Sequence, residues 1–214
     1  MGLETGKCLN VNGVDNLSVI SFGPNSQFSR QALFSGEFIS AAMSAFGQFR
    51  IVVSSHRRMD SAGKIGFVGF GATSIDGGMT WRQQVYLAPS AKVTEFKDVT
   101  ALNAGRVLIV GGYNTANYLA STPALFVSNN SGTSWALTTL GTPSGLIPTR
   151  ISGVGTTAML VTGMNVGVST NSGTSWVYRQ LVSSGGVYDV EMITDQIALA
   201  VASDGVLRTV VERQ

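Results

Sequence analysis

Three turn-like segments carry a side chain of the kind that binds metal ions or acts as a catalytic acid. These side chains are Asp76, Asn130 and Asn171, each flanked by Ser, Gly and Thr residues. Carboxylates in turns are common metal ligands and general acids. Two of the three residues are amides, however, and all three occupy the same position of a repeated pattern. Repetition of this kind indicates a role in folding, so we expect no metal and no cofactor.

The basic cluster of the chain is His56-Arg57-Arg58. We predict a loop at this position, ahead of a strand at 64–70, where the cluster could contact an acidic glycan or a carboxylate of a partner protein. A solvated loop without a ligand is the alternative. His56 and Cys8 are the single histidine and the single cysteine, so the sequence offers no catalytic triad and no set of zinc ligands.

An eight-residue pattern occurs three times along the chain and ends each time in tryptophan. It reads Ser-x-Asp/Asn-x-Gly-x-Thr/Ser-Trp. Asp or Asn in a turn accepts hydrogen bonds from nearby backbone N–H groups, glycine tolerates positive φ, and tryptophan anchors the hairpin by burying a large ring. We assign structural roles to the pattern residues of all three copies: Ser74, Asp76, Gly78, Thr80, Trp81; Ser128, Asn130, Gly132, Ser134, Trp135; Ser169, Asn171, Gly173, Ser175, Trp176.

This pattern resembles the Asp-box of sialidase-like β-propellers. The resemblance implies that each copy closes the hairpin between the third strand and the outermost strand of a propeller blade. A degenerate fourth copy is predicted at 21–28, where Phe28 stands in the place of the tryptophan.

Between the repeats, short runs that are β-branched or alternate in polarity predict strands, and no segment has the periodicity of a helix. Successive box tryptophans are 54 and 41 residues apart, which fits blades of four short strands. We predict an all-β fold, a small β-propeller of about four four-stranded blades with five as the alternative, in which the two termini complete one blade. The chain is expected to be a single domain, 1–214, with residues 1–24 as a candidate N-terminal arm.

The resemblance also implies where a sialidase would carry its active site. Such enzymes use three arginines, a Tyr-Glu pair and an Asp around the central axis, and the first arginine lies in a Phe/Tyr-Arg-Ile-Pro motif. Here Phe49-Arg50-Ile51-Val52 has Val in place of Pro, and further members would be Arg150, Arg208, Tyr188 and Glu191. These candidates rest on residue type and not on spacing, so we expect no catalytic residues.

Composition narrows the class of partner. Only 12% of the residues are charged and the net charge is +2, which argues against nucleic acid as a partner. No apolar run approaches the ~20 residues of a membrane span. Glu4 and Lys7 stand where a signal peptide would need apolar residues, so we expect a virion or extracellular protein that is exported by another route.

We therefore expect a non-enzymatic structural or binding propeller, a virion component of a bacteriophage tail or receptor-binding apparatus that mediates protein assembly or glycan attachment. Its partners would be other virion proteins, copies of itself or a cell-surface glycan. The alternatives are a sialidase-like glycoside hydrolase and a secreted lectin-like propeller. A lectin could stack sugars on the three box tryptophans, but we expect these rings to be buried in the blades.

Overall fold

The described part of the chain consists of β-strands joined by turns. The computed structural model describes residues 3–8, 16–22, 28–35, 38–59, 63–86, 93–115, 120, 122–143, 145–205 and 207–211. Within these ranges there is no helix, and hence none of the length and apolar character needed to cross a membrane.

The strands of these ranges form five antiparallel sheets, and each sheet is built from strands that follow one another along the chain. The first sheet has three strands, the next three have four, and the fifth has three. Their bounds are β1 (Leu3–Cys8), β2 (Asn16–Phe22) and β3 (Phe28–Ser35); β4 (Phe38–Phe46), β5 (Phe49–Met59), β6 (Ile65–Ser74) and β7 (Arg82–Tyr86); β8 (Val93–Ala101), β9 (Val107–Asn114), β10 (Thr122–Ser128) and β11 (Ala136–Thr139); β12 (Arg150–Val154), β13 (Thr157–Thr162), β14 (Asn165–Ser169) and β15 (Val177–Gln180); β16 (Val187–Met192), β17 (Ile197–Ala202) and β18 (Leu207–Val211).

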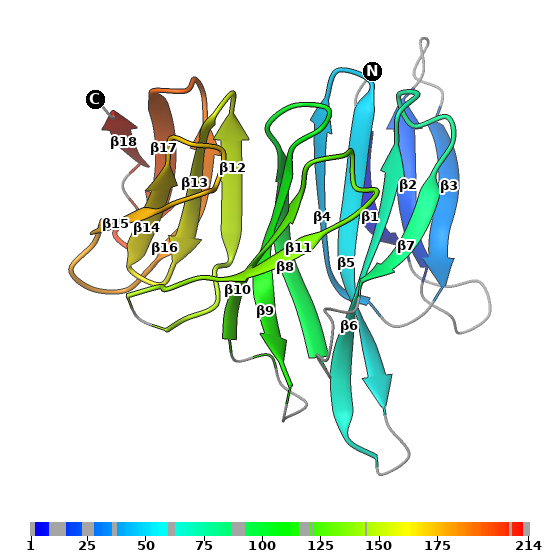
Figure 1. The fold of residues 1–214 in the computed structure, drawn as a ribbon, viewed down its shortest axis with the longest axis horizontal. Helices are drawn as coiled ribbons and strands as arrows, with labels where there is room; N and C mark the ends of the chain where they lie inside the picture. The colour runs from blue at the N-terminus through cyan, green and yellow to red at the C-terminus, as the bar shows by residue number, and fades with distance from the viewer. Residues whose placement is uncertain are drawn as a thin grey trace.

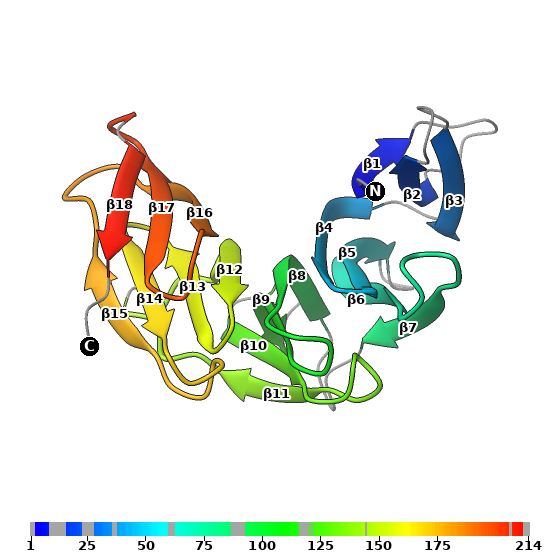
Figure 2. The same ribbon diagram turned by 90° about the horizontal axis from the view of Figure 1, so that it is seen from above.

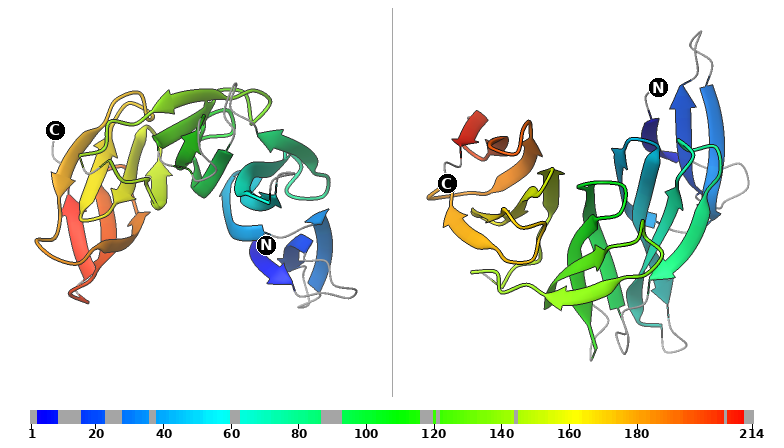
Figure 3. Two further views of the ribbon diagram at one scale, coloured as in Figure 1. Left: turned by 90° about the horizontal axis from the view of Figure 1, so that it is seen from below. Right: turned by 45° about the horizontal axis from the view of Figure 1, so that its top comes forward.

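The five sheets stand side by side (Figure 1), and a view from above shows that they follow an open arc, like blades around an axis (Figure 2). The first strand of each sheet lies on the inner side of the arc and the last strand on the outer side (Figure 2). The two further views in Figure 3 show the same arc, with the N-terminal sheet at one end and the C-terminal sheet at the other. Within the described residues, no strand of β1–β3 makes extended contact with a strand of β16–β18.

The hydrophobic core lies between neighbouring sheets. In β9 the side chains alternate: Val107 and Ile109 pack toward the second sheet, whereas Leu108 and Val110 pack toward the fourth, and all four are fully buried. Strands that are covered on both faces read as continuous apolar runs, which explains the sequence VLIV at this point. Each internal sheet is therefore held by the sheet before it and the sheet after it.

The structure confirms the predicted all-β class and the small β-propeller fold, with five sheets, the alternative count. In β8–β11 and β12–β15 the box joins the third strand of the sheet to the fourth, as the resemblance implied. The expectation that the termini complete one blade is wrong for the described residues, because β1 pairs with β2 in the first sheet and β18 pairs with β17 in the fifth.

The N-terminal region is part of the arc. β1 and β2, which fall within the candidate N-terminal arm, pair with each other, and β2 pairs with β3. The degenerate fourth box connects β2 to β3, and its residues 23–27 lie outside the described residues.

Candidate functional site

All three box segments adopt the same turn between the last two strands of their sheets. In the second box, the Ser128 hydroxyl donates to Asn130 Oδ1 (3.0 Å) and accepts from the Gly132 N–H (2.8 Å). Asn130 Oδ1 also accepts from the Ser134 N–H at 2.8 Å. The first and third boxes repeat these bonds through Asp76 and Asn171. The Asp or Asn is thus a turn acceptor in every copy.

The middle of each box needs left-handed backbone. Gly132 has φ +76°, and Ser131 before it has φ +57°, a conformation that non-glycine residues seldom adopt. The Ser131 N–H donates to Gly105 O (3.1 Å), in the turn that joins the first two strands of the same sheet. The equivalent N–H groups in the other boxes, those of Gly77 and Ser172, donate to Gln48 O and Thr156 O. Each box is therefore fastened to a neighbouring turn of its own blade.

The box tryptophans are half-buried and lie between blades, not within them. Trp81, Trp135 and Trp176 pack against the clusters between the first and second, second and third, and third and fourth sheets. The indole N–H of Trp135 donates to Gly132 O at 3.1 Å, and that of Trp81 donates to Gly78 O at 3.0 Å. The expectation of rings buried inside the blades is corrected accordingly, and each ring anchors its hairpin to the preceding sheet.

Hydrogen bonds in the first box stabilise the ionised form of Asp76. The Thr80 hydroxyl and the Thr80 N–H both donate to this carboxylate, and the Ser74 hydroxyl adds a third bond. These bonds, those of Thr80 first, hold the pKa of Asp76 well below its usual range. The first box therefore uses a charged acceptor where the other two use an amide.

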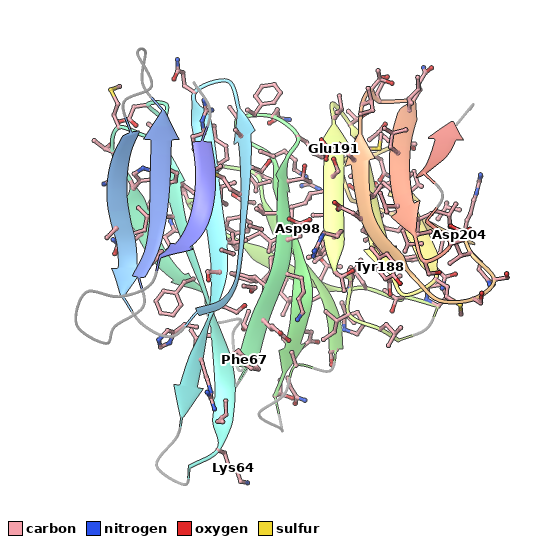
Figure 4. All side chains as sticks on the ribbon, turned by 180° about the vertical axis from the view of Figure 1, so that it is seen from behind. Lys64, Phe67, Asp98, Tyr188, Glu191 and Asp204 are labelled. Atoms are coloured by element: carbon pink, nitrogen blue, oxygen red, sulfur yellow. The ribbon has the colours of Figure 1, made fainter. Side chains whose placement is uncertain are left out.

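A polar cleft of about 360 Å³ lies on the inner side of the arc. The inner strands of the second to fifth sheets, β4, β8, β12 and β16, form its walls. No described lining residue is aromatic. The lining comprises Met43, Ser44, Ala45, Asp98, Val99, Thr100, Ala101, Ile151, Ser152, Gly153, Asp189, Val190 and Glu191. Three carboxylates therefore face the axis, and Figure 4 shows Asp98 and Glu191 on this side of the molecule.

Asp98 is held between two sheets. A bulge at Lys97 in β8 precedes it. Its Oδ1 accepts the Val99 N–H (2.8 Å), and its Oδ2 accepts the Ile151 N–H of the next sheet (2.9 Å). Burial raises the pKa of Asp98 to about 6, although these two backbone bonds and the nearby Arg150 favour the ionised form. Asp98 thus joins β8 to β12 while carrying an unfavourable buried charge.

The other inner strands are joined in the same way. The Ser44 hydroxyl of β4 accepts the Ala101 N–H of β8 at 2.9 Å. The Ser152 hydroxyl of β12 accepts the Met192 N–H of β16 (3.0 Å) and donates to Glu191 Oε2 (3.1 Å). Each of these side chains in the cleft wall therefore bonds across to the next inner strand.

Asp189 in β16 repeats the local geometry of Asp98. A bulge at Tyr188 precedes it, and its Oδ1 accepts the N–H of the following Val190 at 2.9 Å. The guanidinium of Arg150 lies 3.6 Å from the same oxygen. Both partners are well exposed, so this ion pair adds little stability. The described part of the chain has no sixth sheet to which Asp189 could reach.

The structure does not gather the sialidase-like candidates into one site. Arg50 donates to the carbonyl oxygens of Gly47 and Phe49 in its own hairpin and does not line the cleft. Tyr188 is 60% exposed and outside the lining, whereas Glu191 lies within it, and Figure 4 shows the two side chains well separated. The side chain of Arg208 lies outside the described residues.

The basic cluster His56-Arg57-Arg58 lies within β5 and not in a loop, which corrects the prediction. β5 and β6 extend past their neighbours, and Arg57 pairs with Phe67 in the projecting two-stranded ribbon. The His56 ring meets the Phe70 ring edge-on at 5.5 Å. Figure 4 shows Lys64 at the free end of this ribbon, well away from Asp98. A ligand or partner contact at the ribbon stays a prediction.

Asp98, Asp189 and Ser152 are not among the residues predicted from the sequence. The repeated dipeptide Asp-Val, at 98–99 and 189–190 in the first strand of two sheets, is a signal that could have drawn attention to the two aspartates. Ser152 has no comparable signal. Within the described residues, no three His, Cys, Asp or Glu side chains are gathered so that they could hold a metal ion.

Comparisons with known proteins bear on the fold alone. No protein-family profile matches the chain, and no curated protein is similar to it in sequence. The solved structures that resemble it are propellers. The fold is a β-propeller. At 12–14% sequence identity, these similarities say nothing about activity.

Three of these structures show how similar the fold and the sequence of this chain are to those of known propellers. YCF48 bound to D1 peptide superposes with a TM-score of 0.58 at 14% identity, over 91% of this chain and 57% of that one. Trypanosoma rangeli sialidase gives 0.55 at 14% identity, over 94% of this chain and 39% of the enzyme. Penicillium chrysogenum alpha-L-arabinanase complexed with arabinobiose gives 0.60 at 13% identity, over 98% and 70%. The chain therefore spans little more than half of the first protein and about two fifths of the second.

Proposed function

We propose that this protein is a non-enzymatic propeller module that works as a structural component of a larger assembly, such as a bacteriophage tail or receptor-binding apparatus. The observation that carries the proposal is the use made of the axial carboxylates. Both oxygens of Asp98 accept hydrogen bonds from backbone N–H groups, and Glu191 accepts a hydrogen bond from the hydroxyl of Ser152. Groups that hold neighbouring sheets together are poorly placed to move protons to and from a substrate.

The character of the cleft favours assembly over glycan attachment. Sugar-binding sites use aromatic rings as stacking surfaces, and none of the described lining residues supplies one. The box tryptophans pack between sheets, so they do not offer a free platform either. Other virion proteins or copies of this chain are therefore the partners we favour.

A glycoside hydrolase is the second candidate, and one observation favours it. Asp98, with its raised pKa, lines the same cleft as Glu191. A protonated acid beside a second carboxyl group is the arrangement that glycoside hydrolysis uses. A sialidase and an arabinanase are also among the structurally similar proteins.

Hydrolysis assays separate the two candidates. We expect fluorogenic sialosides and arabinofuranosides to be cleaved at the background rate by the wild-type protein and equally by Glu191→Gln. Asp195→Asn, at an exposed turn carboxylate, is the matched control. Turnover that disappears in Glu191→Gln but persists in the control, with both variants folded, would establish the hydrolase and refute the structural role.

A further inference from the structure

Three junctions between described inner strands share one device, a side chain that accepts a backbone N–H group of the next sheet. The Ser44 hydroxyl accepts such a bond from the third sheet at 2.9 Å, and the Ser152 hydroxyl accepts one from the fifth sheet at 3.0 Å. Between the third and fourth sheets the acceptor is the carboxylate of Asp98, which bonds the Ile151 N–H at 2.9 Å. Of these three acceptors, Asp98 is the one that can change its charge near neutral pH.

The two hydrogen bonds of Asp98 are fixed in different ways. The Val99 N–H belongs to the next residue of the same strand, so covalent geometry keeps it close to the carboxylate. The Ile151 N–H belongs to β12, and the packing of two sheets holds it in place. A carboxylate accepts both bonds, whereas protonation turns one of its oxygens into an O–H donor. One bond is then lost, and the bond across the interface is the one that is free to lengthen.

The charged groups around Asp98 lie on β12 and β16. Arg150 favours the ionised form of Asp98 and Asp189 opposes it, and Glu191 lines the same cleft. β4, β5, β6 and β9 also pack against β8, but no described residue of these four strands brings a charge into the lining of the cleft. Burial outweighs Arg150 and the two backbone bonds, and it raises the pKa of Asp98 to about 6. A small fall from neutral pH therefore neutralises this carboxylate.

We infer that Asp98 is a pH-operated latch, which ties β8 to β12 when it is ionised and releases the Ile151 N–H when it is protonated, while the rest of the interface stays packed. The buried side chains of Leu108, Leu125 and Leu160 hold the third and fourth sheets together in both states. The serine hydroxyls at the two neighbouring junctions keep their bonds, because they do not titrate in this range. Acidification therefore loosens the inner edge of one interface in the arc. This inference does not depend on the proposed assembly role.

The latch is tested on the folded wild-type protein by NMR, between about pH 4.5 and about pH 7.5. The Ile151 amide resonance should shift with a midpoint near 6, in step with the carboxyl carbon of Asp98. The amides of Ala101 and Met192, which bond to the serine hydroxyls, are matched internal controls and should not follow this titration. An Ile151 amide that does not titrate, or three amides that titrate together, would overturn the inference.

Hydrogen exchange measures the release itself. After correction for the intrinsic effect of pH on exchange, the protection of the Ile151 amide should fall by about tenfold below the midpoint, as expected for the loss of one hydrogen bond. The protection of Ala101 and Met192 should stay the same. Equal protection of Ile151 on both sides of the midpoint would show that protonation leaves the tie in place and would overturn the inference.

Two variants identify the titrating group. In Asp98→Asn the Ile151 resonance should no longer depend on pH in this range, whereas Asp195→Asn, at an exposed turn, should keep the wild-type titration. Arg150→Gln removes a cation that favours the ionised form, so the midpoint should move to higher pH. A titration that persists in Asp98→Asn would assign it to another group and overturn the inference. If Asp98→Asn does not fold, as judged by circular dichroism, Arg150→Gln decides in its place, and an unchanged midpoint there would overturn the inference.

Discussion

Replacing Asp98 with asparagine should change how the stability of the fold depends on pH. The pKa of Asp98 rises from 3.8 to about 6 on folding, because the carboxylate is buried between β8 and β12. A shift of roughly two units corresponds to about 3 kcal/mol. Since the folded-state pKa lies above the unfolded value, the protonated form of Asp98 stabilises the fold relative to the ionised form. This contribution is complete below about pH 4 and is lost as the pH rises through about 6.

The amide introduced by Asp98→Asn has no charge, but it also offers one acceptor fewer than the carboxylate. One of the two backbone N–H groups, of Val99 or Ile151, then lacks its partner, as it also does in the wild type once Asp98 is protonated. We therefore expect Asp98→Asn to be close to the wild type in stability near pH 4 and more stable than it, by up to about 3 kcal/mol, near pH 7. The change in sign or size of this difference, and not its value at one pH, is the diagnostic quantity.

The assay is urea unfolding followed by tryptophan fluorescence at several values between about pH 4 and pH 7. The half-buried rings of Trp81, Trp135 and Trp176 report on the packing between sheets. Asp195→Asn serves as the control, because Asp195 is exposed in the turn between β16 and β17. Parallel curves for the wild type and Asp98→Asn across the whole range would refute the claim that burial dominates the titration of Asp98.

Two further predictions concern the boxes. Gly132→Val should destabilise the fold by about 3 kcal/mol, because the residue has φ +76° and a Cβ there would lie 2.7 Å from Thr73 of the preceding sheet. The thermal midpoint should fall by about 6–12 °C, and an unchanged midpoint would contradict the requirement for glycine. Asp76→Asn should leave the midpoint near pH 7 unchanged, because the other two boxes already carry Asn. Because the pKa of Asp76 is depressed in the folded protein, its carboxylate stabilises the fold at pH values above the ordinary pKa of Asp, and this contribution is lost as the pH falls. Asp76→Asn has no carboxylate to protonate, so its stability should fall less than that of the wild type below about pH 4. Unfolding of Asp76→Asn at neutral pH would show that the three boxes are not equivalent.

Some features of the site could be predicted only in part. The residue types of the basic cluster were recognisable, but its position was not, because β5 and β6 extend past their neighbours and carry Arg57 into a paired ribbon. Asp98 could not be recognised from the sequence as a site residue, because its hydrogen-bond partner Ile151 lies 53 positions away in the chain. A contact of this range depends on how one sheet packs on the next, which no local pattern encodes.

By itself, the sequence determined the strands and the box turns. The bonds of each box join residues two to four positions apart, as between Ser128, Asn130 and Gly132, so eight consecutive residues are enough to specify the turn. Within the described residues, the tertiary structure alone decided the number of sheets, their arrangement in an arc and the difference in exposure between Val201 and the fully buried Val110. These two valines follow equally strand-like patterns, and they differ because the fourth sheet covers Val110 whereas no described residues pack over Val201 in the same way. Burial is a property of the packed neighbours and not of the strand.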